Sequence, residues 1–380
     1  MGNFTSQLLF FLLFFNITAF SQDSLRIGTK FVPIPELSFN TDNGLKIAGE
    51  VQLYNYGFNS VKPFESFSRY RISYSSIGAF SLLASNDDVN VFGSDTRVFY
   101  YGFMSRNLAD YYFGDTDKQD YDAARYDSSD YYNFDMMRID FGALIRSPIG
   151  TWNEGVGVEF KKGLAITYER PLETLDSDFI ETDNVSGQNG ALLTIVELGL
   201  IYDRRNSEFR AGNGILLDIG SKYSLPFVSR YHGLQNYFTA LGFIPITKKL
   251  FDITLATRFS FINTIGEKPY WLTPALGGSG TMRGFIYRRF SSDNAISYSA
   301  ELRSWLFSIP NSNMEFGGHI FIDGGRVFSN ENWKSILTNH RYALGFGGVM
   351  SIFTPDFLLK AEIGFSEDGT GIYLGTGYSF

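Results

Sequence analysis

Alternation of apolar and polar side chains is the feature that most limits what this chain can fold into. In residues 251–261 the large apolar side chains all occupy odd positions, namely Phe251, Ile253, Leu255, Phe259 and Phe261. The even positions of the same stretch include Asp252, Thr254, Arg258 and Ser260. A period of two is that of a β-strand, because successive side chains of a strand point to opposite faces. The pattern therefore predicts strands with one apolar and one polar face.

About sixteen such segments follow one another along the chain, and each alternates over roughly ten residues. Strands of a soluble β-sandwich also alternate, but they are usually nearer to five or six residues long. Long strands with a charged second face are typical of a wall between lipid and a polar lumen. The predicted fold is an all-β, 16-stranded antiparallel transmembrane β-barrel.

The N-terminus contains an apolar run, residues 8–20, which predicts an export signal. At about 13 residues the run is too short to cross a bilayer as a helix, but it suits the apolar core of a signal peptide. Ala19 and Ser21 place small side chains where a signal peptidase requires them. We therefore expect a signal peptide at 1–21 with cleavage near Ser21–Gln22, a periplasmic lead at 22–33, and a barrel at 34–380. The expected location is the Gram-negative outer membrane.

Composition argues against several classes of function. The chain has no cysteine, three histidines and a net charge of −8. It can form no disulfide or cysteine-based zinc site, and its charge does not suit nucleic acid. His232, His319 and His340 lack the spacing of a catalytic triad or a zinc site. We expect no enzymatic activity, no cofactor and no metal, with a protease or phospholipase barrel as the alternative.

Three short motifs follow one another along the chain. Tyr202-Asp203-Arg204-Arg205-Asn206 is followed by Gly214, and a glycine-rich loop contains Met282-Arg283-Gly284-Phe285. Phe321, Asp323 and Gly325 then form an F-x-D-x-G pattern within a predicted strand.

In this order the motifs resemble those of the BamA-type outer-membrane protein assembly factor superfamily, also called bacterial surface antigen barrels. The resemblance covers roughly 34–380 and is to the branch that lacks N-terminal POTRA domains. It implies that the sixth extracellular loop, 264–293, folds into the lumen. It also implies that Arg283 pairs there with acids on the twelfth and thirteenth strands, which correspond to Glu301 and Asp323.

The parity of the two acids supports this placement independently. Glu301 alternates with the apolar residues Ala300 and Leu302, and Asp323 follows Ile322, so both acids are expected to face the lumen. An arginine fork can pair with a carboxylate through two parallel hydrogen bonds. A solvated glycine-rich hairpin that does not dock is the alternative.

The last residues resemble the terminal signal that the barrel assembly machinery reads when it inserts a barrel. The pattern comprises Tyr373, Gly375, Tyr378 and Phe380, with Tyr378 and Phe380 on one face of the last expected strand. An ordinary edge strand is the alternative.

Residues 110–135 are acidic and rich in tyrosine. A D-x-D-x-x-D-x-D run within them could bind calcium, but it lacks the glycine and the closing glutamate of an EF-hand loop. A solvated outer loop, bridged loosely to lipopolysaccharide by divalent ions, is the simpler interpretation.

The resemblance implies a barrel that assists insertion or translocation of outer-membrane or surface proteins, or of lipids. The expected partners are outer-membrane lipid and lipopolysaccharide, the barrel assembly machinery, a separate periplasmic protein or lipoprotein, and a second copy of the chain. A passive structural or small-conductance channel barrel that retains only the fold is the alternative.

Overall fold

The computed structural model describes most of the chain after residue 26. It covers 27–380 except 41–43, 59–62, 77, 92–93, 118–121, 123, 125, 127–130, 153–155, 173–179, 181–184, 227, 248–251, 311–313 and 353. The predicted signal peptide, 1–21, lies outside the described residues. Within them, sixteen strands form one antiparallel sheet whose order follows the chain.

The strands vary from 8 residues in β18 to 20 residues in β6. The first eight are β1 (Thr29–Asn40), β2 (Gly44–Asn55), β3 (Ser66–Ser75), β4 (Phe80–Val91), β5 (Thr96–Tyr111), β6 (Asn133–Trp152), β7 (Val156–Pro171) and β8 (Ala191–Asp203). The others are β9 (Gly214–Ser224), β10 (Gly233–Thr247), β11 (Asp252–Gly266), β14 (Asn294–Ser308), β15 (Glu315–Phe328), β16 (Arg341–Ile352), β17 (Thr354–Ser366) and β18 (Gly369–Thr376). Because β1 begins at Thr29, the last residues of the predicted lead belong to the sheet.

Among the described residues, two short strands and two 3₁₀ helices lie outside the main sheet. β12 (Ala275–Leu276) pairs with β13 (Phe290–Ser291) inside the connection from β11 to β14. The 3₁₀ helices are η3 (Tyr270–Leu272) and η4 (Trp333–Leu337). No helix in the described part of the chain is long and apolar enough to cross a membrane.

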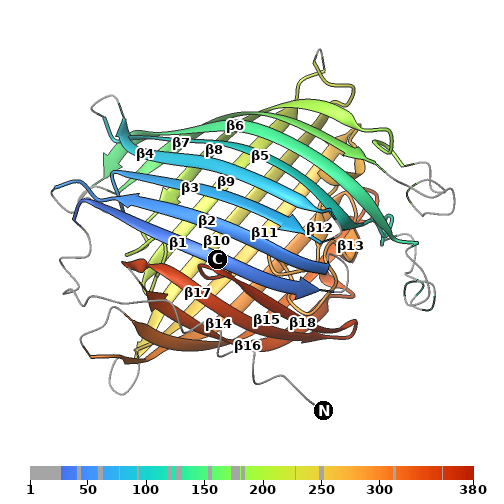
Figure 1. The fold of residues 1–380 in the computed structure, drawn as a ribbon. Coiled ribbons are helices and arrows are strands. Elements are labelled where there is room, and N and C mark those ends of the chain that lie inside the picture. The colour runs from blue at the N-terminus through green and yellow to red at the C-terminus, as the bar shows by residue number, and fades with distance from the viewer. Residues whose placement is uncertain are drawn as a thin grey trace.

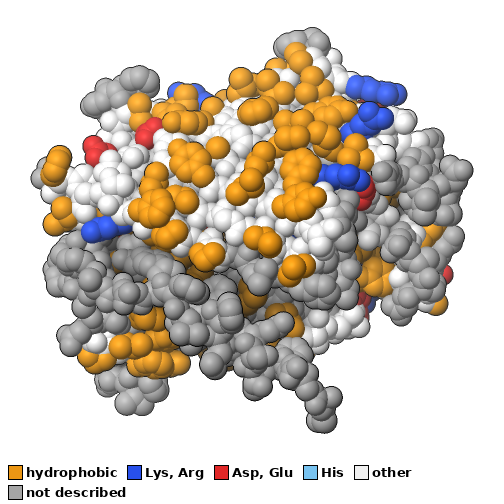
Figure 2. All heavy atoms as spheres, viewed as in Figure 1, with side chains coloured by type: hydrophobic (Ala, Val, Ile, Leu, Met, Phe, Trp, Pro, Cys, Tyr) orange, Lys and Arg blue, Asp and Glu red, His pale blue; other side chains and the backbone are white. Residues whose placement is uncertain are grey.

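The two faces of the sheet differ as the alternation predicts. On β15, Ile320 and Ile322 are 59% and 50% exposed, whereas His319, Phe321 and Asp323 are buried. Figure 2 shows one outer face of the molecule, where hydrophobic side chains cover the middle and lysine and arginine lie toward the edges. An apolar band between charged rims is the surface that a lipid bilayer stabilises.

The sheet curls into a barrel-shaped wall, so that its first and last strands approach each other (Figure 1). Among the described residues no backbone ladder joins β1 to β18. Side chains connect the two ends of the sheet instead. Val32 of β1 packs in one cluster with Phe357 of β17, and the hydroxyl groups of Tyr56 and Thr354 are 2.9 Å apart.

One glycine on the inner face creates the space for a large ring. Gly345 of β16 pairs directly with Phe321 of β15. A Cβ atom at position 345 would lie 2.3 Å from Phe321 Cζ and 2.1 Å from the carbonyl oxygen of Ile363. Because the second clash is with backbone, a side-chain rotation cannot relieve it.

We therefore expect Gly345→Ala to destabilise the barrel by about 1–3 kcal/mol, the usual cost of overpacking. The measurement is the thermal unfolding of the purified protein, which is monitored through its mobility on a denaturing gel with and without heating. Gly49→Ala is the matched control, because a Cβ there would have no atom within 4 Å. Equal stability of the two variants would show that the packing of the Phe321 ring does not require a glycine at position 345.

Candidate functional site

The connection between β11 and β14 turns inward and places residues 277–289, here called the inner loop, inside the wall. Gly277 and Gly284 adopt φ angles of 120° and 97°, which only glycine adopts readily. Gly284 also lies directly against β17, since a Cβ there would be 3.0 Å from backbone atoms of Gly364 and Phe365. Its carbonyl oxygen accepts a hydrogen bond of 2.8 Å from Ser366 Oγ. The glycines therefore allow the loop to pack closely against the strand wall.

Arg283 extends from this loop into a group of three carboxylates. Its Nε and Nη2 donate to the two oxygens of Asp323, each at 2.8 Å, and its backbone N–H donates to the same side chain at 3.0 Å. Nη1 lies 2.7 Å from Glu301 Oε1 and 2.7 Å from Glu362 Oε1. The guanidinium carbon is 3.4 Å from the centre of the Phe321 ring. Fork pairing with one acid and stacking on an aromatic face are geometries that lysine cannot reproduce.

The charges in this site balance. Three carboxylates, those of Glu301, Asp323 and Glu362, face three cations, those of Arg283, Arg303 and Lys360. Arg303 Nε is 2.7 Å from Glu301 Oε2, and Lys360 Nζ is 2.8 Å from Glu362 Oε2.

Arg283 stays positively charged despite its burial, with only 1% of the residue exposed. Burial lowers its pKa, but hydrogen bonds to Asp323 and the charges of Glu301, Asp323 and Glu362 outweigh this effect. Its pKa is consequently raised above the ordinary value. Buried charges are stable only when paired in this way.

Strand register explains how the acids converge. Glu301 of β14 pairs with Phe321 of β15, and Ser299 pairs with Asp323. Ser299 Oγ also donates to Asp323 Oδ1 at 2.6 Å. The sequence predicts Glu301 and Asp323 as partners of Arg283, and in the structure Arg283 forms ion pairs with both.

Glu362 was missed by the sequence reasoning. It belongs to β17. Its neighbours Ala361 and Ile363 are apolar, so the alternation along the strand indicates that Glu362 faces inward. Parity alone does not place it beside Arg283, because that proximity depends on how three strands and the inner loop fit together.

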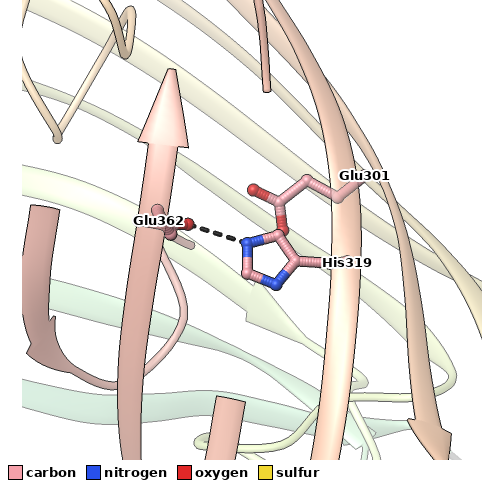
Figure 3. Close-up of side chains that lie close together, drawn as sticks. All are labelled: Glu301, His319 and Glu362. Carbon is pink, nitrogen blue, oxygen red and sulfur yellow. Dashed lines mark hydrogen bonds and ion pairs between the residues drawn. The ribbon is translucent and has the colours of Figure 1, made fainter. Parts of the chain in front are cut away.

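A histidine and two acids in this site could formally hold a metal ion. The ligand atoms of Glu301, His319 and Glu362 all lie within 4.8 Å of one another (Figure 3). His319 Nε2, however, is hydrogen-bonded to Glu362 at 2.9 Å, and the nearby arginine and lysine side chains already neutralise both carboxylates. A divalent cation would have to displace Arg283 and Lys360, so the cluster fits an internal ion-pair network better than a metal centre.

The apolar side chains of the loop motif are buried against the strand wall. Met282 and Phe285 are 0% and 2% exposed, and they belong to a cluster completed by Leu276, Phe290, Ala295, Val327 and Ala343. Gly325 makes room for this cluster, since a Cβ at that position would lie 3.0 Å from Met282 Sδ. The loop is thus held by packing as well as by charge.

The last strand departs from the sequence prediction. Tyr373 and Gly375 lie on β18, and Tyr373 Oη accepts a hydrogen bond of 2.8 Å from the backbone N–H of Gly284. β18 ends at Thr376, so Tyr378 and Phe380 do not share a strand face as predicted. Gly377 adopts a φ of 73°, which turns the chain away from the ladder. The Arg303 guanidinium then lies 3.9 Å from the Tyr378 ring centre and 4.7 Å from that of Phe380.

The Tyr202–Asn206 motif forms the end of β8 and the first part of the turn, residues 204–213, that leads to β9. The backbone N–H groups of Gly212 and Asn213 donate to Asn206 Oδ1 at 2.9 and 3.0 Å. Gly214 has a φ of 112°, and a Cβ there would lie 2.1 Å from the carbonyl oxygen of Arg204. The motif therefore shapes the turn and lies apart from the Arg283 cluster in the sheet.

Part of the acidic stretch 110–135 lies outside the described residues. Among those described, Asp135 lies 2.6 Å from Arg106 Nη2, and Asp117 lies 3.2 Å from Arg326 Nη2. Asp117 also accepts a hydrogen bond from the backbone N–H of Ser329 at 3.0 Å. These two acids are engaged by the protein itself, and the calcium hypothesis stays a prediction.

Solved structures that share the fold include two kinds of outer-membrane barrel protein. The chain aligns over 92% of its length with BamA from Haemophilus ducreyi lacking POTRA domains 1–3, at a TM-score of 0.55 and 15% identity. It also aligns with CdiB from Escherichia coli, at a TM-score of 0.61 and 14% identity over 92%, and with CdiB from Acinetobacter baumannii, at 0.52 and 15% over 91%. The aligned part spans 69%, 62% and 59% of those three chains respectively.

No curated protein matches the sequence. Identities this low show a common architecture only. A family model, the Omp85 superfamily domain, matches residues 46–380, which include every residue of the Arg283 cluster. The chain is therefore a member of the Omp85 superfamily.

Proposed function

We propose that this protein is an outer-membrane barrel that assists the insertion or translocation of outer-membrane or surface proteins, or of lipids. In this proposal it works with a separate periplasmic partner. The observation that carries the proposal is the docking of the inner loop by Arg283 on Glu301, Asp323 and Glu362. Membership of the Omp85 superfamily supports it, as does the shared fold with BamA and CdiB.

The docked loop would act as an internal plug and strut. The Arg283 side chain connects β14, β15 and β17, because the three acids that it contacts come from these three strands. A second contact joins it to the last strand through Tyr373. A loop that braces this half of the wall can change the shape of the wall when it moves.

The unpaired edges of the sheet supply a place where a client could engage. β1 and β18 are joined by no ladder within the described chain, so each leaves backbone donors and acceptors without strand partners. Such an edge can pair with an incoming strand by β-augmentation. Opening would then need only the separation of side-chain contacts such as Tyr56 with Thr354.

Replacing Arg283 tests the plug directly. We expect Arg283→Ala to destabilise the docked loop by about 3–5 kcal/mol, because it leaves buried carboxylates without their cation. Arg283→Lys should recover only part of this, since an ammonium group cannot reproduce the fork on Asp323. In planar bilayers the wild type should show small, flickering conductance, and the alanine variant should show larger and longer openings.

The control for this experiment is Arg341→Ala at an exposed pair. Arg341 Nη1 lies 2.7 Å from Glu367, with both side chains about half exposed, and such pairs contribute less than about 1 kcal/mol. A large, steady current through the wild type would contradict the plug and favour the passive channel.

The cellular role is tested by depleting the protein and measuring the outer-membrane proteome quantitatively. We expect selective loss of a few barrel or surface proteins, which would identify the clients. Complementation with Arg283→Ala should fail to restore them, whereas Arg341→Ala should succeed. An unchanged proteome with altered permeability to small solutes would refute the insertion role and leave a channel.

A further inference from the structure

The segment 377–380 leaves the sheet and runs into the lumen. The backbone N–H of Gly377 donates to the carbonyl oxygen of Leu358 at 2.9 Å, and the positive φ of Gly377 then redirects the chain. Ser379 Oγ accepts a hydrogen bond of 2.7 Å from Lys360 Nζ. It donates toward the carboxylate of Glu362 at 3.2–3.3 Å. Ser379 thus reaches the acid cluster that holds Arg283.

The end of this segment contacts a different part of the wall. Phe380 packs against a buried apolar group, here called the wall patch, which comprises Ala211, Leu241, Phe243 and Ala256. Three of these residues belong to β10 and β11, which in the sheet are separated from β18 by β14, β15, β16 and β17. The segment therefore connects the last strand with strands well removed from it in the sheet.

Two arginines hold Phe380 on the wall patch. Arg303 Nη2 donates to the carbonyl oxygen of Phe380 at 2.9 Å. The guanidinium groups of Arg303 and Arg258 lie 4.7 and 5.1 Å from the Phe380 ring centre. Cation–π contacts of this kind are strongest where water is excluded.

The same arginines also hold the inner loop. Arg258 donates to the carbonyl oxygens of Gly280 and Thr281 at 2.7 and 2.9 Å. Arg303 is paired with Glu301, which in turn faces Arg283. Each arginine that touches Phe380 therefore touches the loop or one of its acids.

We propose that the wall patch, together with Arg258 and Arg303, is a docking site for the segment 377–380, and that this docking stabilises the inner loop in its lumenal position. The segment is a latch: release of Phe380 frees the two arginines to rearrange and weakens their hold on the loop. Undocking of the loop and withdrawal of the segment from the wall patch are then linked steps. The inference needs no client or partner, so it stands or fails independently of the proposed cellular role.

The test uses a single thiol as a reporter of loop undocking. The chain has no cysteine, and the Met282 side chain of the inner loop is fully buried. The thiol of Met282→Cys should therefore react with a maleimide only when the loop leaves its docked position. In this background Phe380→Ala and Phe243→Ala remove the two rings of the latch contact. We expect each to raise the labelling rate about tenfold or more, since Phe243 is buried and Phe380 packs against it, and truncating a packed phenyl ring shifts such an equilibrium that far.

Combining the two substitutions should add little, because both remove the same contact.

Each protein is refolded from denaturant into detergent, so that an assembly signal at Phe380 is not required. Only protein with folded gel mobility is scored. Phe243→Ala leaves the terminal pattern intact, so it tests the proposal even if Phe380→Ala does not fold. Phe346→Ala, on the exposed outer face of β16, is the control. Labelling rates equal to this control in both variants would overturn the latch.

Discussion

The ion pairs of Arg283 are the interaction on which the rest of the inner structure depends. One buried guanidinium joins acids from three strands, and the loop that carries it is glycine-rich enough to touch the wall. Removing water from four charged groups costs several kcal/mol for each ion. The geometry offsets this cost through a two-point fork, a stacked aromatic ring and a balanced set of neighbouring cations. The site is stable as a whole and not through any single contact.

Much of the fold is predictable because strand alternation is a local property. β11 covers Asp252–Gly266, and it contains most of the alternating stretch 251–261 from which a strand was predicted. β1 begins at Thr29, before the expected start of the barrel at residue 34. Its early residues contain Pro33, which suits an edge strand but interrupts the apolar pattern. The predicted pairing of Arg283 with Glu301 and Asp323 came from a motif resemblance together with parity, which are also local features.

The rest of the site depends on how distant segments meet, which no local pattern encodes. Glu362 and His319 have the right parity, but their proximity to Arg283 arises from the stagger between β15, β16 and β17. Gly345 has no apparent meaning in sequence, yet it makes room for the ring on which Arg283 stacks. The final aromatic residues were predicted to continue a strand. They turn inward because Gly377 permits the turn and Arg303 provides a cationic face for them.

A balanced buried cluster favours two discrete states over gradual motion. If Arg283 moves by a small distance, its fork on Asp323 breaks before water can solvate the acids, so intermediate positions have high energy. Full withdrawal lets water enter and hydrate all the charges at once. The backbone contact of Gly284 with Tyr373 and the shared contacts of Arg258 and Arg303 connect this transition to the last strand and to the segment after it. In the described part of the chain the edge strands of the wall share no ladder. A loop held by charge inside such a wall can therefore couple its own position to the state of that edge.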